Sequence, residues 1–214
     1  MSKFTNRIEK LSNRIMNFSK YIENRNNLFK DIGNQLTTNN IHYCFIGGAV
    51  LSIYNYERYT TDIDILIDSR DEKLFQNSLN SIGFRKAFNT ATKKFIFKSI
   101  PVDIIFSGEP SDYDYPYPEK ISEVKIIDGT KVNFVSLLKL VEIKMTSGYY
   151  GIDREKDIGD VRELIKSNNL KKNFLDSSSD KFIVSKYKEL FEESELLAKM
   201  TPLERRYYIQ NKNK

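Results

Sequence analysis

The spacing of hydrophobic residues changes twice along this chain, and no other feature of the sequence limits its fold as strongly. Over residues 4–36 the apolar side chains recur every three or four positions, which is the period of an amphipathic helix. Residues 61–67 instead alternate polar and apolar side chains, which is the period of a β-strand. From residue 135 onward the pattern is helical again. The sequence therefore predicts an α+β fold, in which a mixed β-sheet lies between N-terminal and C-terminal helices.

Short apolar or alternating runs, separated by turn residues, predict the strands of this sheet. The predicted strands cover residues 42–46, 61–67, 84–88, 94–98, 102–106, 124–127 and 131–134. Asp128 and Gly129 separate the last two strands, and this pair is typical of a two-residue hairpin turn. Two helices are predicted between the strands, at 49–56 and 71–82, and a loop is predicted at 107–119.

These patterns divide the chain into three regions. We expect an N-terminal helical extension over residues 1–40, an α/β core over 41–134 and a C-terminal helical region over 135–214. A break near Asn26 and Asn27 interrupts the first helical pattern. The helices of the last region are predicted at 135–147, 154–167, 180–199 and 202–211.

The scarcity of cysteine and histidine excludes several classes of site. Cys44 is the only cysteine and His42 the only histidine of the 214 residues. An internal disulfide framework, a Cys- or His-rich zinc site and a Ser-His-Asp triad are therefore not expected. No run approaches the roughly 18 apolar residues of a membrane span, and the N-terminus lacks the apolar region of a signal peptide. We expect a cytoplasmic protein with no membrane partner.

Charge is distributed unevenly along the chain, whose net charge is +5. Residues 1–40 carry 7 basic and 3 acidic side chains, and residues 181–214 carry 8 and 5. The segment between them carries 19 basic and 21 acidic side chains. The basic flanks suit a polyanionic partner such as RNA, with solvated helix faces as the alternative interpretation.

Three carboxylates are the strongest candidates for chemistry. Asp62 and Asp64 are two residues apart on a predicted strand, so their side chains point to the same face. Asp103 lies on a second predicted strand between apolar residues. Three carboxylates on adjacent strands would form an oxygen cage suited to Mg²⁺. Two such ions could neutralise the charge of a triphosphate, activate an attacking oxygen and stabilise the leaving one. The alternative for each aspartate alone is a solvated carboxylate or a salt-bridge partner.

Two glycines separate the predicted strand 42–46 from the helix predicted after it. Gly47 and Gly48 would allow a phosphate to approach the backbone close to that helix's N-terminus. A strand-to-helix turn also uses glycine for purely geometric reasons.

Taken together, four motifs are more specific than any one of them. In chain order they are Gly47-Gly48-Ala49-Val50, the run Arg58-Tyr59-Thr60-Thr61-Asp62-Ile63-Asp64, Val102-Asp103-Ile104, and Lys144 followed by Arg154-Glu155-Lys156-Asp157-Ile158-Gly159-Asp160. This series resembles the nucleotidyltransferase superfamily that includes DNA polymerase β, and most closely its bacterial AbiEii/AbiGii-type members. The resemblance covers roughly residues 41–167.

The resemblance implies roles for the residues of the first three motifs. Gly47 and Gly48 would hold the β- and γ-phosphates of a nucleotide. Asp62 and Asp64 would bind the metal ions, with Mg²⁺ expected and Mn²⁺ as an alternative. Asp103 would share the metal and accept a proton from the incoming hydroxyl.

Basic residues are implied as further nucleotide contacts. Lys144 would contact the triphosphate. Lys139 is the alternative, because the sequence does not determine which of the two lysines the helix turns toward the nucleotide. Arg58 and Thr60 are candidates for nucleotide contact and, more strongly, for bracing the strand that bears the aspartates. Lys156 is a further candidate, with a salt-bridged helix start as the alternative for its motif.

The function implied is Mg²⁺-dependent transfer of NMP from an NTP to an acceptor hydroxyl, with pyrophosphate as the leaving group. The basic flanks favour RNA, such as tRNA, or protein as the acceptor. An aminoglycoside-like antibiotic as acceptor, or a non-catalytic nucleotide- or protein-binding module, are the alternatives. The AbiEii resemblance also suggests a toxin–antitoxin or phage-defence role. Two departures from the family's pattern are Ala49-Val50, where many relatives have Ser or Thr, and Gly148–Gly151, which suggests an inserted loop.

Overall fold

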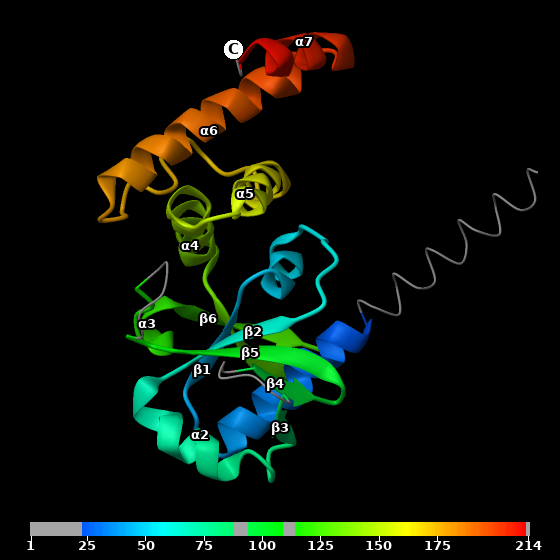
Figure 1. Ribbon diagram of the computed structural model, residues 1–214, viewed down its shortest axis with the longest axis vertical. Coiled ribbons are helices and arrows are strands. Elements are labelled where there is room, and N and C mark those ends of the chain that lie inside the picture. The colour runs from blue at the N-terminus through cyan, green and yellow to red at the C-terminus, as the bar shows by residue number, and fades with distance from the viewer. Residues whose placement is uncertain (1–22, 88–93, 109–113, 213–214) are drawn as a thin grey trace, which may run out of the picture. The chain divides into compact units, whose positions relative to one another are not determined.

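The computed structural model describes residues 23–87, 94–108 and 114–212 of the chain (Figure 1). These residues form two compact units. The first unit comprises the described residues within Met1–Ala49, Thr60–Glu109 and Tyr115–Val135, and the second those within Val50–Tyr59, Pro110–Asp114 and Ser136–Lys214. The described part of the N-terminal helix thus belongs to the unit that contains the sheet, and the segment before Thr60 belongs with the C-terminal helices.

A seven-stranded mixed sheet forms the first unit, which agrees with the predicted α+β fold. Its strands are β1 (Tyr43–Ile46), β2 (Ile63–Ile67), β3 (Phe84–Lys86), β4 (Lys94–Phe97), β5 (Ile100–Phe106), β6 (Ser122–Ile127) and β7 (Thr130–Val135). They lie in the order β3-β4-β5-β2-β1-β7-β6. At the centre β2 is parallel to β5 and antiparallel to β1, while β1 is parallel to β7. The predicted strands are all present, and the part of 84–88 beyond Ala87 lies outside the described residues.

The predicted hairpin between β6 and β7 is confirmed. Ile127 pairs with Thr130, so the turn consists of the two residues Asp128 and Gly129. Their φ angles are 45° and 81°, and this left-handed backbone at both positions matches the twist of the flanking strands. Lys30 Nζ lies 2.8 Å from the Asp128 carboxylate and ties the turn to the N-terminal helix.

Two helices cover one face of the sheet through aromatic side chains. The helix over residues 23–38 packs Phe29 against Phe45 of β1 and Phe134 of β7, with ring centroids 4.7 and 5.0 Å apart. Helix α2 (Glu72–Ser78) buries Phe75 against aromatic rings of β3, β4 and β5. Helix α2 lies below β2 and β5 in Figure 1. An aromatic layer therefore forms the core of the first unit on this face of the sheet.

Several predicted boundaries in this unit differ from the structure. The helix 23–38 runs through Asn26 and Asn27, so the predicted break there is wrong. The buried residues Phe29, Ile32 and Leu36 anchor this segment on the sheet, and tertiary packing outweighs the local propensity of asparagine. The earlier part of the predicted helix lies outside the described residues. Within the predicted loop, Pro118–Ile121 form a short helix, α3.

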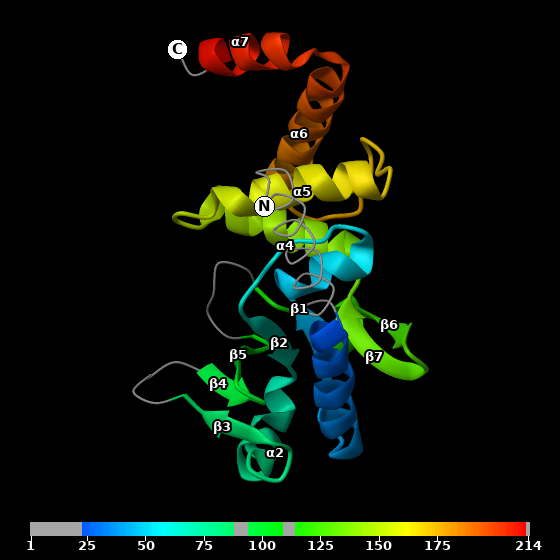
Figure 2. The same cartoon turned by 90° about the vertical axis from the view of Figure 1, so that its right-hand side faces the viewer.

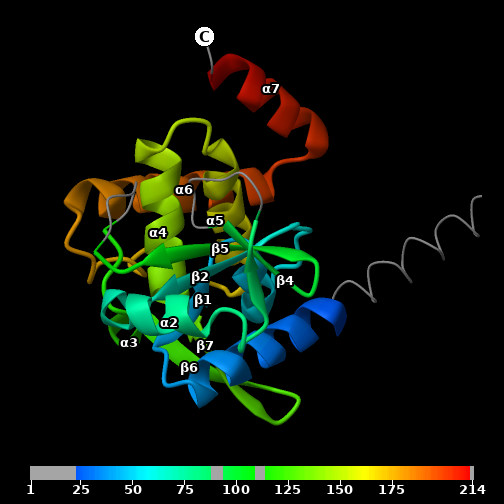
Figure 3. The ribbon, with the colours of Figure 1, turned by 60° about the horizontal axis from the view of Figure 1, so that its bottom comes forward.

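Helices form the second unit. They are α4 (Leu137–Tyr150), α5 (Glu155–Ser167), α6 (Lys181–Lys199) and α7 (Pro202–Lys212), preceded by the 3₁₀ helix η1 (Ala49–Tyr54), which stands where an α-helix over 49–56 was predicted. Helix α4 continues through Gly148, so the inserted loop expected at Gly148–Gly151 is wrong. A Cβ at Gly148 would lie 2.5 Å from Ile158 Cδ1, so this glycine permits close packing of α4 on α5 (Figure 3). Among the described residues, no helix has the length and apolar character that crossing a membrane requires.

Candidate active site

The turn after β1 is shaped by contact with an aspartate. Gly47 follows the last residue of β1 and has a φ of +74°, a conformation that side chains with a Cβ rarely adopt. A Cβ at Gly47 would lie only 1.9 Å from Asp64 Oδ2. Ile46, just before the turn, pairs with Asp64 across β1 and β2. Glycine is therefore required at position 47, because the Asp64 side chain occupies the space beside its Cα.

Strand pairing brings two of the three predicted carboxylates together. Asp64 on β2 pairs with Asp103 on the parallel strand β5, so the two side chains stand on the same face of the sheet. Their neighbours in the register, Ile65 and Ile104, are buried on the opposite face, which the aromatic layer covers. Asp62 lies just before β2 begins at Ile63. The prediction that Asp64 and Asp103 lie on adjacent strands is confirmed.

Asp62 and Asp103 each have a defined polar partner. Thr60 Oγ1 donates a hydrogen bond of 2.6 Å to Asp62 Oδ1. Lys94 Nζ lies 3.5 Å from Asp103 Oδ2, and the Asp103 side chain is 29% exposed. The sequence patterns did not identify Lys94. The pairing of β4 with β5, which sets Lys94 opposite Asp103, is the signal that identifies it. These contacts hold two half-buried carboxylates at defined positions near the centre of the sheet.

The described residues contain no group of three or more acidic, histidine or cysteine side chains arranged to hold a metal ion. The metal-binding role expected for Asp62, Asp64 and Asp103 therefore stays a prediction. The donor chemistry still suits Mg²⁺, because Asp64 and Asp103 present carboxylate oxygens from neighbouring strand positions.

In the second unit, the structure places Lys144 inside a buried ion network. Its side chain is 5% exposed, and its amine donates to Asp157 Oδ1 at 2.8 Å and to Asp160 Oδ2 at 2.7 Å. Ser147 donates a further hydrogen bond of 2.9 Å to Asp157. Arg58 Nε lies 3.1 Å from Asp160 Oδ1. The lysine and the two aspartates of the last motif thus meet each other, and Arg58 joins them.

This network keeps the Asp157 carboxylate charged. Burial raises the pKa of Asp157, but attraction and hydrogen bonding from Lys144, with the hydrogen bond from Ser147, lower it further, so its pKa lies below the usual value. The other basic candidates lie outside the network. Lys139 Nζ donates to Glu142 Oε2 at 2.8 Å, and Lys156 is exposed.

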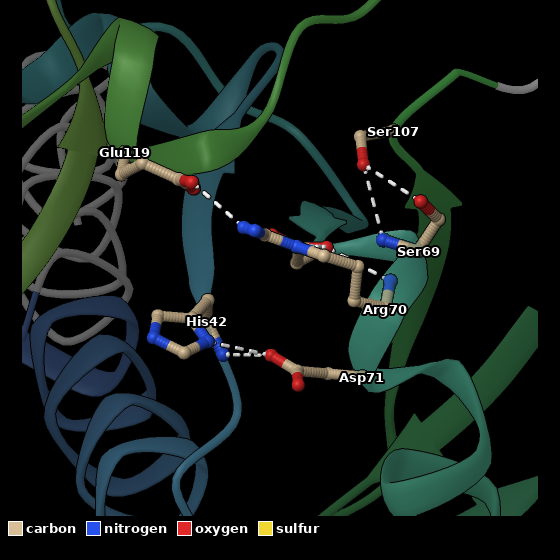
Figure 4. A network of polar contacts seen from close by, with 7 residues as sticks. His42, Ser69, Arg70, Asp71, Ser107 and Glu119 are labelled. Carbon is tan, nitrogen blue, oxygen red and sulfur yellow. Dashed lines mark hydrogen bonds and ion pairs between the residues drawn. The ribbon is translucent and has the colours of Figure 1, made fainter.

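A second polar cluster lies at the other end of β2 and holds the chain rather than a substrate (Figure 4). Asp68, fully buried, directly follows β2 and accepts hydrogen bonds from Arg70, whose guanidinium lowers the pKa of this carboxyl. Arg70 also donates to Glu119 at 2.7 Å. His42 makes two hydrogen bonds with Asp71, one from its backbone and one from its ring. The only imidazole of the chain is thus engaged away from Asp64 and Asp103.

Solved structures of similar fold are nucleotidyltransferase-like proteins. An antigenic nucleotidyltransferase-like protein from Paracoccidioides brasiliensis matches with a TM-score of 0.59 at 18% identity, over 81% of this chain and 90% of that chain. The solution structure of the antibiotic-resistance factor ANT(2″)-Ia matches with a TM-score of 0.54 at 14% identity, over 81% of this chain and 96% of that chain. Its crystal structure in complex with adenylyl-2″-tobramycin matches with a TM-score of 0.53 at 14% identity, over 79% and 98%.

No protein-family model and no curated protein matches this sequence. At these identities the structural likeness identifies the fold, which is that of nucleotidyltransferase-like proteins.

Proposed function

We propose that this chain is a nucleotidyltransferase, which transfers NMP from an NTP to the hydroxyl of an acceptor. The observation that carries the proposal is the pairing of Asp64 with Asp103 beside the Gly47 turn, within a fold of this class. Two half-buried carboxylates side by side repel each other, so a pair held in this way is a good candidate for binding cations. The Asp-x-Asp run and the apolar-Asp-apolar run supply them in the order that the superfamily resemblance implies.

In this proposal Asp62, Asp64 and Asp103 hold divalent metal, two Mg²⁺ ions or in their place Mn²⁺. The metal supplies neutralisation of the triphosphate charge and orientation of the reacting oxygens. Gly47 and Gly48 present backbone without side chains, which lets phosphate oxygens approach the turn. Thr60 keeps Asp62 in place through its hydrogen bond, which agrees with its expected bracing role.

The reaction proposed is an in-line displacement. The acceptor oxygen bonds to the α-phosphorus, the bond from that phosphorus to the pyrophosphate oxygen breaks, and pyrophosphate leaves with the electron pair. Asp103 accepts the proton of the acceptor hydroxyl, since its side chain is partly exposed and no imidazole lies near it in the described structure. No nucleophile of the protein takes part.

The last motif takes a different role from the one that the resemblance implied. The Lys144 amine forms ion pairs with Asp157 and Asp160, and the lysine side chain is buried. We therefore assign Lys144 a structural role in the second unit rather than contact with the triphosphate. Arg58 belongs to the same network through Asp160. Lys139 is engaged with Glu142, which leaves Lys156 as the exposed basic candidate for nucleotide contact in this part of the chain.

For the acceptor, the basic flanks support RNA, tRNA included, or protein. The resemblance to AbiEii-type proteins favours a toxin–antitoxin or phage-defence setting. A small-molecule acceptor is the second candidate, because ANT(2″)-Ia, solved with adenylyl-2″-tobramycin, has a similar fold. A binding module without catalysis is the alternative to both.

The test is incubation of the purified chain with each of four α-³²P-labelled NTPs, Mg²⁺, total RNA and cell protein. Label in RNA or protein supports transfer and identifies the acceptor class, and parallel reactions with aminoglycosides test the small-molecule acceptor. The control is the variant Asp62→Ala/Asp64→Ala, which should lose labelling while circular dichroism shows that it remains folded. Labelling that persists in this variant, or no labelling of any acceptor, would overturn the proposal.

A further inference from the structure

The two edges of the sheet differ in length and in the side chains they expose. Strand β6 forms one edge and, among the described residues, pairs only with β7 (Figure 2). It has six residues, and the side chains of Val124 and Ile126 are 57% and 70% exposed. The other edge, β3, has three residues and exposes the charged side chains of Arg85 and Lys86. Short, charged edges resist pairing with another chain, whereas long apolar edges favour it.

The backbone of β6 is arranged to accept another strand. In a two-residue hairpin the pair that flanks the turn, here Ile127 and Thr130, exchanges hydrogen bonds, and such pairs then alternate along the strands. The register has no bulge, so Lys125 and Glu123 follow Ile127 as inward hydrogen-bonded positions. Val124 and Ile126 therefore direct their N–H and C=O groups toward the free edge of the sheet, while their exposed side chains stand on one of its faces.

We infer that β6 pairs with β6 of a second copy of this chain, antiparallel and centred on Val124, so that one sheet continues through a two-fold dimer. The charges along the strand favour this occupant and this register. With Val124 opposite its own copy, Glu123 faces Lys125 of the second copy and Lys125 faces its Glu123. Opposite charges at facing positions of antiparallel strands stabilise the pairing, while Val124 and Ile126 cluster on the other face.

Neighbouring registers lose this match. Registers centred on Ser122 or Ile126 also use outward-directed backbone groups, but they do not set Glu123 opposite Lys125. Each of these registers therefore loses the pairing of opposite charges. In the single chain Lys125 Nζ and Glu123 Oε1 lie 2.7 Å apart, so both charges already sit on the same face of the strand, where the facing copy would meet them. A two-fold interface is self-complementary by necessity, and this strand meets that requirement.

The test is the mass of the full chain in solution, measured by light scattering or sedimentation across a series of concentrations. We expect a monomer–dimer equilibrium, and we expect Ile126→Lys to raise the dimer dissociation constant by about tenfold or more. Ile152→Lys is the matched control, because Ile152 is 89% exposed and lies outside the sheet. Circular dichroism confirms that each variant is folded, which an exposed position permits. A parent chain that stays monomeric, or a dimer that Ile126→Lys does not weaken, overturns the inference.

Charge reversal tests the register itself. Glu123→Lys alone sets lysine against lysine at both symmetry-related positions and should weaken the dimer several-fold. The double variant Glu123→Lys/Lys125→Glu restores opposite charges across the two-fold axis and should recover the parent's dissociation constant. If the double variant stays as weak as the single one, the proposed register is wrong. Because none of these residues belongs to the proposed catalytic site, nucleotidyl transfer and dimer formation can fail independently.

Discussion

The chain contains two groups of aspartates that the same family resemblance singles out, and their surroundings differ in the structure. In the first unit, Asp64 and Asp103 lie on adjacent strands, both half-buried, with Asp103 only loosely paired to Lys94 at 3.5 Å. In the second unit, the side chains of Asp157 and Asp160 are 7% and 2% exposed, and each lies within 2.8 Å of the Lys144 amine.

The difference in burial and pairing indicates a structural role for one group of aspartates and a ligand-binding role for the other. A buried carboxylate that is matched by a lysine, an arginine and a hydroxyl has little capacity left for a ligand, and removing one partner leaves an uncompensated charge in the interior. A half-exposed pair of carboxylates on neighbouring strands retains oxygens that a cation can share. We therefore expect the second unit's aspartates to control stability and the first unit's aspartates to control activity.

The largest effect is expected from Lys144→Ala. It leaves Asp157 and Asp160 buried without their shared cation, which costs about 3–5 kcal/mol of the free energy of unfolding. Urea unfolding measures this, with Lys166→Ala as control, because its exposed pair with Glu163 contributes about 0–1 kcal/mol. Asp64→Asn should instead lose transfer with little change in stability. A Lys144→Ala variant of normal stability that no longer transfers NMP would indicate that Lys144 contacts the nucleotide. The proposed contrast between the two groups of aspartates would then be wrong.

Gly47→Ala should affect the first unit through Asp64. The new Cβ would clash with Asp64 Oδ2 at 1.9 Å, and displacing a reacting group by about 1 Å can reduce the rate about a hundredfold. Gly108→Ala is the matched control, because Gly108 has the same φ of +74° but nothing lies within 4 Å of its Cβ position. The rate of NMP transfer and the melting temperature are measured for both. Equal losses in the two variants would mean that backbone conformation, not the contact with Asp64, is what matters.

The sequence was sufficient to predict the sheet and the positions of Asp64 and Asp103 within it. Alternating patterns defined β2 and β5, and two apolar-Asp-apolar runs placed the carboxylates on them. Pattern reasoning could not predict that β2 and β5 pair in the register that aligns Asp64 with Asp103, since register depends on contacts between distant segments.

The contacts of Lys144 could not be predicted from the sequence for a related reason. A lysine followed by an Arg-x-Lys-Asp-x-x-Asp run has the same spacing whether its amine faces a phosphate or the aspartates of the next helix. The choice depends on how closely α4 and α5 approach, and Gly148 permits the close approach seen here. The break assigned to that glycine was wrong because a glycine in a helix can serve packing rather than termination.

Acid should weaken the network of the second unit through the protonation of Asp157. The pKa of Asp157 is lower in the folded chain than its usual value of 3.8, so its ionised form stabilises the fold above that pH. This contribution is lost as the pH falls from about 4 through the folded pKa. Thermal unfolding across this range should show a smaller pH dependence in Asp157→Asn than in the parent, with Glu163→Gln as an exposed control. A variant with an unchanged pH profile would show that Asp157 is not the group that titrates.

The smallest effect, and the finest test of the first unit, is expected from Thr60→Val. The change removes the hydroxyl that donates at 2.6 Å to Asp62 while keeping the shape of the side chain. A hydrogen bond to a charged group contributes about 1.5–3 kcal/mol, but Asp62 is half-buried and water can replace much of it, so about 1 kcal/mol of stability should be lost. Transfer should fall several-fold, because Asp62 then samples orientations other than the one that holds metal, and raising the Mg²⁺ concentration should recover part of the rate. Thr60→Ser keeps the hydroxyl and should behave as the parent. If Thr60→Val transfers at the parent's rate at every Mg²⁺ concentration, the hydrogen bond serves the turn before β2 alone, and Asp62 is positioned by the strand that follows it.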